Sequence, residues 1–149
     1  MGDRRIHYDQ TKLLAMEVFA DETVADRIAA ADLSVDAEHP AGWSRDYWRH
    51  FDPLGWVPGR RDARESLAEY FLDLAVKTSD RRYLGHGLHC LQDKAMHGFI
   101  PWEGRPWVWT KPSWRDDPRT NPHGAQRAEA AAKDYLGRFC RLPPSLLAI

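Results

Sequence analysis

Hydrophobic positions recur with a period near 3.6 residues in five stretches of the chain, a pattern that predicts amphipathic helices. The stretches cover residues 6–19, 22–35, 62–77, 80–97 and 122–140. Sustained alternation of apolar and polar residues and Asn-Gly turns, which would indicate β-hairpins, are both missing from the sequence. The pattern predicts an all-α fold, a helical bundle of about five helices.

The same pattern assigns a buried face to each helix. In the first helix the expected buried positions are Leu13, Leu14, Met16, Val18 and Phe19. In the third they are Leu67, Tyr70, Phe71, Leu74 and Ala75, and in the last Ala128, Ala132, Tyr135, Leu136 and Phe139. Asp62, with Glu65 three residues later, predicts a capping box at the start of the third helix. Residues 99–121, rich in Pro and Trp, predict one long loop, which in a compact domain is usually functional or mobile.

The fourth helix carries the clearest chemical signal. His89, Asp93 and His97 stand at positions i, i+4 and i+8, so they share one helical face. Two imidazoles and a carboxylate on one stripe suit a borderline divalent metal such as zinc. A buried hydrogen-bond network or a polar helix face is the alternative interpretation. Gly85 and Gly87 each destabilise a helix by about 1 kcal/mol relative to Ala, so close approach of a helix or a ligand is expected there.

Two carboxylates end the second helix. Asp32 and Asp36 lie four residues apart near its C-terminus, where the helix dipole disfavours negative charge. A compensating cation is therefore expected, and a metal ion would serve. Plain exposure to solvent is the alternative, with Asp32 expected to be the more exposed of the two.

Composition and charge narrow the class of protein. The 149 residues are enough for one domain with its own core, so residues 1–149 are expected to form a single helical domain. A net charge of −1 gives no basic field for nucleic acid or an anionic membrane, and no apolar run approaches the length of a membrane span. The N-terminus lacks the apolar core of a signal peptide, and Cys90 and Cys140 are expected to be free thiols. These features favour a cytoplasmic location, and nothing in the sequence indicates an oligomeric state.

Tryptophan is unusually frequent. All seven Trp residues lie between Trp43 and Trp114, mostly in segments rich in Pro and Gly. Trp commonly lines pockets and interfaces, and the alternative is that these side chains pin long loops over a small core.

Four motifs follow one another between residues 6 and 99. A histidine begins the first helix, an aspartate ends the second, a His-Phe pair lies in the next loop, and Leu-Gly-x-x-Leu-His-x-x-Gln-Asp fills the fourth helix. They correspond to His7, Asp36, His50-Phe51 and residues 84–93. Together they resemble the zinc-dependent phospholipase C and P1 nuclease superfamily, most closely its small bacterial members. The resemblance implies an all-α bundle with up to three zinc ions that cleaves a phosphoester.

The resemblance also implies roles for the matching residues. Asp36, His50 and His89 would share one metal ion. His7 and Asp93 would hold a second ion in bridging range of the first. Two open divalent sites about 3.5–4 Å apart could clamp the attacking and leaving oxygens of a phosphoester.

A third metal ion would be bound by His97, by a later histidine, and by a Glu four residues after that later histidine. His123 is the candidate histidine, but position 127 is Arg127. This is a departure from the family pattern, and Glu129 is the nearest substitute. The resemblance therefore implies two zinc ions and leaves the third open, and another divalent metal could replace zinc.

Catalytic and substrate-binding residues follow from this arrangement. Asp36 or Asp32 could take the proton of the nucleophilic water. Arginines of the long loop, Arg105, Arg115 and Arg119, could meet a phosphate, although solvated loop charges are the alternative for each. The residues expected to bind substrate are His86, Trp102, Arg105 and Trp107.

Three functions stay open from the sequence. The first is a metal-dependent hydrolase, phospholipase C-like or a phosphodiesterase, acting on a small-molecule phosphoester. The second is a metalloenzyme of the same scaffold with a different reaction on a small specialised metabolite. The third is a non-catalytic, metal-stabilised binding protein.

Overall fold

The computed structural model describes residues 4–38, 49–50, 59–97 and 118–143. Within them the chain forms α-helices and a short π-helix, and these residues contain no strand. The elements in order are η1 (Arg5–Gln10), α1 (Thr11–Phe19), α2 (Glu22–Glu38), α3 (Ala63–Thr78), α4 (Arg82–His97) and α5 (Pro122–Cys140). The all-α prediction is confirmed, with helix ends within three residues of those expected.

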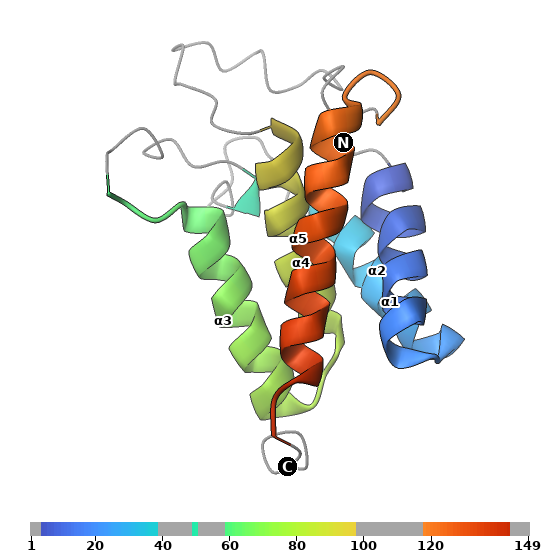
Figure 1. Ribbon diagram of the computed structural model, residues 1–149. Coiled ribbons are helices and arrows are strands. Elements are labelled where there is room, and N and C mark those ends of the chain that lie inside the picture. The colour runs from blue at the N-terminus through green and yellow to red at the C-terminus, as the bar shows by residue number, and fades with distance from the viewer. Residues whose placement is uncertain (1–3, 39–48, 51–58, 98–117, 144–149) are drawn as a thin grey trace.

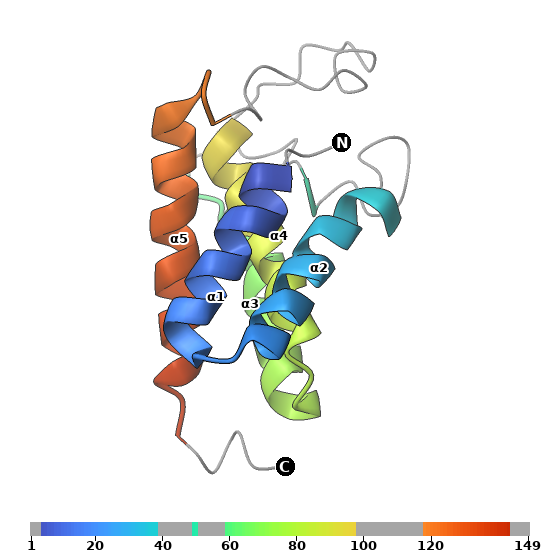
Figure 2. The same ribbon diagram turned by 90° about the vertical axis from the view of Figure 1, so that its right-hand side faces the viewer.

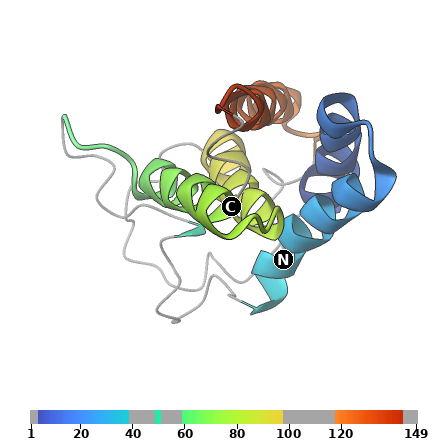
Figure 3. The ribbon, with the colours of Figure 1, turned by 90° about the horizontal axis from the view of Figure 1, so that it is seen from below.

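Helix α4 is the central element of the bundle (Figure 1). It packs against α2, α3 and α5, whereas α1 packs against α2 and α5. Seen along the bundle, α3 covers one side of α4 while α1 and α2 lie on the other (Figure 3). Figure 2 shows the start of the first helix and the C-terminal half of α4 side by side, a contact that η1 makes directly. Side chains of α4 can therefore meet residues from several other segments.

The first helix departs from regular α geometry at its start. The sequence predicts one continuous helix over residues 6–19, but Arg5–Gln10 forms a π-helical turn before α1. Such turns widen the helix locally and are frequent at functional sites. The turn contains His7, which is buried.

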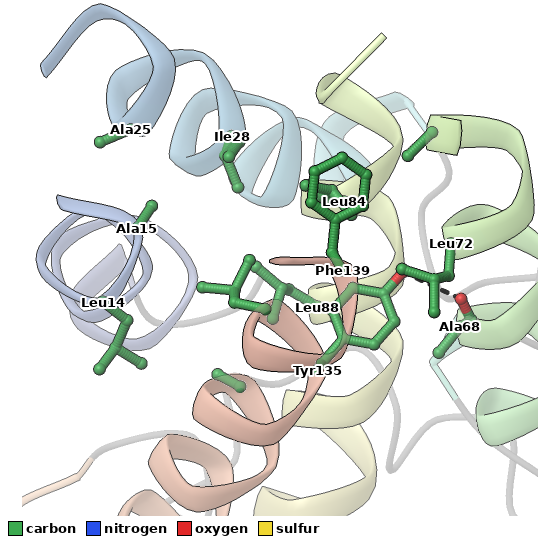
Figure 4. Close-up of a cluster of buried hydrophobic side chains, with 13 residues drawn as sticks. Leu14, Ala15, Ala25, Ile28, Ala68, Leu72, Leu84, Leu88, Tyr135 and Phe139 are labelled. Carbon is green, nitrogen blue, oxygen red and sulfur yellow. Dashed lines mark hydrogen bonds between the residues drawn. The ribbon is translucent and has the colours of Figure 1, made fainter. Parts of the chain in front are cut away.

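Two apolar clusters fill the interior. The larger one joins α1, α2, α3, α4 and α5 around Leu84, Leu88 and Tyr135, as Figure 4 shows. The smaller one consists of Ile6, Met96 and Ala128. The predicted apolar face of α5 is confirmed in full, since Ala128, Ala132, Tyr135, Leu136 and Phe139 are all buried.

Three predicted core positions are wrong. Leu13 is 66% exposed, Tyr70 is 56% exposed and Met16 is 36% exposed. Leu14 and Phe71 face the core instead. Because successive residues of a helix are about 100° apart, the immediate neighbours Leu13 and Tyr70 point towards solvent. An apolar pair of adjacent residues does not reveal from sequence which member is buried.

The helix glycines mark close approaches between elements, as the sequence predicted. A Cβ on Gly85 would meet the backbone of α2, at the carbonyl oxygen of Ile28 and 2.7 Å from the nitrogen of Asp32. A Cβ on Gly87 would overlap the ring of Tyr135, whose hydroxyl donates to the Ala68 carbonyl at 2.9 Å (Figure 4). Gly85 thus brings α2 directly against α4, next to Asp32.

Side-chain caps begin α3, α4 and α5, and the one at Asp62 was predicted from the sequence. Asp62 accepts from the Arg64 amide at 2.9 Å, Asp80 from the Arg82 amide at 3.0 Å, and Asn121 from the Gly124 amide at 3.0 Å. The Asp62 carboxylate also pairs with the buried guanidinium of Arg64 at 2.7 Å. Burial would raise the pKa of Asp62, but the hydrogen bonds and charge of Arg64 outweigh it and lower that pKa.

Asp62→Ala is expected to reduce the free energy of unfolding by about 1–3 kcal/mol, because it removes a helix cap and the partner of a buried cation. A lowered pKa in the folded state adds stability above the usual pKa and loses it as pH falls through the lowered value. The deficit of the variant should therefore shrink in acid, as measured by urea unfolding between pH 7 and pH 3. Asp80→Ala, which removes a similar cap beside the exposed Arg82, should cost less, and an equal loss in both variants would contradict this account.

None of the described helices is long and apolar enough to cross a membrane. Trp102, Arg105 and Trp107, which were expected to bind substrate, and Arg115, which could meet a phosphate, lie outside the described residues.

Candidate metal centre

A buried polar cluster lies against α4. Its members come from η1, α2, the segment before α3, and α4, and they are His7, Asp32, Asp36, His50, His89 and Asp93. All except Asp36 are buried, and the Asp36 side chain is 13% exposed. Three imidazoles and three carboxylates are thus gathered from four parts of the chain.

Asp93 lies between two groups of ring nitrogens. Its Oδ2 is 2.8 Å from His50 Nδ1 and 3.4 Å from His89 Nε2. Its Oδ1 is 3.4 Å from His7 Nε2 and 3.6 Å from His97 Nε2. The two oxygens of one carboxylate therefore face different sets of imidazoles.

The first set brings three donor atoms close enough together to share one metal ion. His50 Nδ1 and His89 Nε2 are 3.1 Å apart, which completes a triangle with Asp93 Oδ2. Asp36 Oδ1 lies 3.8 Å from His50 Nδ1 and 3.9 Å from His89 Nε2. Zinc bonds of about 2.0–2.1 Å would place tetrahedral ligand atoms about 3.3–3.4 Å apart. The three donors of His50, His89 and Asp93 fit one zinc ion with small adjustments, and Asp36 lies at the edge of this set.

Two groups of donors could hold a metal ion: His7, Asp36 and His89, and His50, His89 and Asp93. His89 belongs to both groups. Its ring stacks on that of His7 with centroids 4.2 Å apart and stands edge-on to His50 at 4.8 Å. The donor set, neutral imidazoles with carboxylates, is one that zinc and similar divalent metals use.

Without an ion, protons compensate the buried carboxylates. Burial alone would lower the pKa of His7, but hydrogen bonds to Asp32 and Asp93 raise it well above the usual value. Burial and the charge of His7 also lower the pKa of His89, but Asp93 and Asp32 outweigh them and raise it to about 9. Burial would raise the pKa of Asp93, but the charge of His89 and hydrogen bonds from His50, His7 and His89 hold it well below its usual range.

Metal binding is therefore expected to release protons at neutral pH. A metal needs the lone pair of His7 and His89, and both rings are protonated at pH 7 because their pKa values are raised. Affinity should rise with pH, by about tenfold per pH unit for each proton displaced, until the pH passes about 9, where His89 is already neutral. Calorimetric titration with zinc in two buffers of different ionisation enthalpy measures the protons released. Binding without proton release at pH 7 would contradict these raised pKa values.

The structure reverses the expected exposure of the two α2 carboxylates. Asp32, expected to be the more exposed, is 0% exposed, whereas Asp36 is at the edge of the cluster. Helix α2 runs to Glu38, so both carboxylates lie inside the helix and on its α4 side. The close packing at Gly85 is what buries Asp32.

Three buried polar residues around the cluster escaped the sequence analysis. Thr11 donates to Asp32 Oδ2 at 2.6 Å, and Gln92 lies between Thr11 and His7. Arg64 donates to the carbonyl oxygen of His50 at 3.3 Å, which links that residue to α3. Gln92, three residues after His89, stood in the recognised motif and offered a signal, but nothing in the sequence pointed to Arg64.

The residues predicted for a third metal are not gathered in one place. His97 reaches Asp93, but His123 is exposed in the first turn of α5 and belongs to neither donor group. Glu129 forms a surface ion pair with Lys133 at 2.8 Å, and Arg127 donates to the Ala95 carbonyl at 2.8 Å. The described residues therefore give no set of donors around His97 and His123.

His86, predicted to bind substrate, packs among aromatic rings of α3 and α4. Its ring is edge-on to Phe71 and Tyr83, with centroids 5.3 Å and 6.0 Å away, and Arg49 lies beside it. Arg119, the one loop arginine within the described residues, is exposed.

An open pocket of about 630 Å³ lies at the other end of the bundle, lined by residues that include Val76, Arg81 and Phe139. Along α4, Arg82, which also lines the pocket, is about 17 Å from Asp93 at 1.5 Å per residue. This pocket is therefore separate from the polar cluster.

Comparison of the chain with protein-family models, with curated proteins and with solved structures finds no match in any of the three.

Proposed function

We propose that this protein is a metal-dependent hydrolase that cleaves a phosphoester of a small molecule, with zinc bound at two adjacent positions. The observation that carries the proposal is the position of Asp93, whose two oxygens face His50 and His89 on one side and His7 and His97 on the other. A carboxylate so placed can bridge two cations. Paired divalent ions are a common device for phosphoester hydrolysis.

The motif resemblance supports the same assignment independently. The residues it implies as ligands are His7, Asp36, His50, His89 and Asp93. All five lie in one buried cluster. Residues that merely happened to match scattered motifs would have no reason to converge from four segments.

The chain's own residues have distinct tasks in this reaction. Bound divalent ions supply charge stabilisation to phosphate oxygens and lower the pKa of a water molecule. His7, His50, His89 and Asp93 would hold the ions and would keep them out of bulk solvent. Asp36, the most exposed carboxylate of the cluster, is placed to accept the proton of the attacking water.

A non-catalytic metal centre is the second candidate. It is favoured by the burial of His7, His89 and Asp93, each at most 4% exposed. Structural sites are closed by protein ligands, whereas catalytic sites keep a position open for water or substrate. The catalytic and the non-catalytic metal centre differ in whether a coordination position stays open for water or substrate beside Asp36 and His97.

Two measurements test the proposal. Elemental analysis of the purified protein should give two zinc ions per chain, and bis-p-nitrophenyl phosphate should be hydrolysed in a zinc-dependent manner. Zinc without turnover across phosphomonoesters and phosphodiesters would favour the structural role or another reaction on a small metabolite. Absence of any bound metal after purification without chelators and reconstitution with zinc would overturn the proposal.

A further inference from the structure

Asp32 is the most deeply enclosed carboxylate of the cluster. It is 0% exposed, and each of its oxygens has a polar partner. Oδ2 accepts from the Thr11 hydroxyl at 2.6 Å, and Oδ1 lies 3.1 Å from His7 Nδ1 and 3.3 Å from His89 Nδ1. The backbone carbonyl of Asp32 lies 3.0 Å from the same nitrogen of His89. One residue thus contacts the Nδ1 atoms of two histidines.

The surroundings determine which ring nitrogen keeps its hydrogen when each ring gives up one proton to bind a metal ion. His89 Nδ1 faces only oxygen acceptors of Asp32, so it must carry hydrogen and donate. His7 Nδ1 faces Asp32 Oδ1 and, at 3.0 Å, the side-chain oxygen of Gln92. Both rings therefore donate through Nδ1, which directs Nε2 towards Asp93.

The orientation of Gln92 is itself fixed. Its Nε2 donates to Thr11 Oγ1 at 2.8 Å and to the Ile6 carbonyl at 3.3 Å. This leaves the side-chain oxygen of Gln92 as the group that faces His7. The Thr11 hydroxyl, having accepted from Gln92, gives its own hydrogen to Asp32. The network is consistent at every atom only if the two imidazoles donate through Nδ1.

We infer that Asp32 is a positioning residue that holds His7 and His89 with Nδ1 protonated, so that both present Nε2 to the metal ions. Thr11 and Gln92 keep Asp32 and His7 in place. A carboxylate or carbonyl that accepts from the distal nitrogen of a metal-bound histidine fixes the ring and increases its basicity, and its loss typically weakens metal binding 10- to 100-fold. Asp32 would serve two such histidines at once.

This role differs from that of a general base. A base must reach the attacking water, whereas Asp32 is enclosed and its oxygens are engaged by Thr11 and two imidazoles. The inference rests on the metal-binding part of the proposed function and does not depend on which reaction the protein catalyses.

The decisive variant is Asp32→Asn, which keeps the size of the side chain but replaces an acceptor with an amide that can donate to Nδ1. An Nδ1 that accepts must leave its proton on Nε2, the nitrogen that the metal needs. We expect the zinc Kd to rise 10- to 100-fold. Nuclear magnetic resonance of the ring nitrogens of zinc-loaded wild-type protein should show Nδ1–H and metal-bound Nε2 for His7 and His89. In the variant the fraction of each ring in this form should fall, although the Gln92 oxygen and the Asp32 backbone carbonyl still accept from the two Nδ1 atoms.

Two comparisons separate positioning from general disruption. Asp26→Asn makes the same change on α2 at a carboxylate that pairs with Tyr8 and Lys12, and should leave the zinc Kd unchanged. Thr11→Val removes the hydroxyl that holds Asp32 and should weaken zinc binding, whereas Thr11→Ser should restore it. If Asp32→Asn does not fold, the comparison of Thr11→Val with Thr11→Ser still tests the positioning role of Asp32.

Failure of this inference can be told from failure of the metal centre. Wild-type zinc affinity in Asp32→Asn and Thr11→Val, or a wild-type protein with zinc on Nδ1, would overturn the positioning role alone. Unchanged zinc affinity with lost turnover in Asp32→Asn would identify Asp32 as a base instead. A wild-type chain that binds no zinc would overturn the proposed function and this role together.

Discussion

His89→Gln is expected to remove the zinc ion that His50, His89 and Asp93 would hold and to abolish phosphoester hydrolysis. His89 is the one residue common to the two groups, and its Nε2 lies within 4 Å of His50, Asp93 and Asp36. Loss of a direct ligand should weaken binding by more than about 100-fold, since outer partners of a ligand alone are worth 10- to 100-fold. Zinc stoichiometry after dialysis and hydrolysis of bis-p-nitrophenyl phosphate measure the two effects.

Two histidines outside the donor groups serve as controls. His123→Gln makes the same substitution at an exposed position of α5, and His86→Gln makes it on α4 one turn before His89. Both variants should keep the full zinc content. A His89→Gln protein that retains two zinc ions would show that the donor groups are not the metal site.

Gly85→Ala is expected to destabilise the protein by about 2–3 kcal/mol, although alanine alone would favour the helix by about 1 kcal/mol. The added Cβ meets backbone atoms of α2, the Ile28 carbonyl and the Asp32 amide, which cannot rotate away as a side chain would. Helix α2 must move, and Asp32 moves with it. Urea unfolding should show the loss of stability, and zinc titration should show weaker binding.

Gly137→Ala is the matched control, because it places the same methyl group on α5. There the Cβ meets only the side chain of Arg141, at 3.2 Å from Nη1, and that flexible group can shift. The variant should be neutral or more stable by up to about 1 kcal/mol. If Gly85→Ala proved as stable as the wild type, the contact between α2 and α4 would be looser than the structure describes.

The positions of the helices could be predicted from the sequence because they depend on local periodicity and on caps such as Asp62. The buried side of each helix was harder to predict. At Leu13 and Leu14, or Tyr70 and Phe71, two adjacent apolar residues both satisfied the pattern, and only packing against neighbouring helices decided between them. The buried face of α5 was clear from the sequence, because polar residues border its apolar stripe.

The candidate site, too, could be predicted from the sequence only in part. The register of His89, Asp93 and His97 on one face is a local property of a helix, and the sequence predicted it. The burial of Asp32 was predicted wrongly, because it depends on how closely α2 approaches α4 at Gly85. The contact of Arg64 with His50 joins residues 14 positions apart, and no sequence pattern near either residue indicated it.

By itself, the sequence determined that the described part of the chain is helical, where its helices begin and end to within three residues, and which face of the fourth helix carries imidazoles and a carboxylate. Only the tertiary structure decided that His7 and His50 reach that face, that Asp93 lies between two sets of ring nitrogens, and that Asp32 is enclosed. The physical reason is the sequence separation of the residues that are in contact. Hydrogen bonds within a helix join residues four apart, whereas the contacts of Asp32 with His7 and His89 span 25 and 57 positions and exist only once the helices have packed.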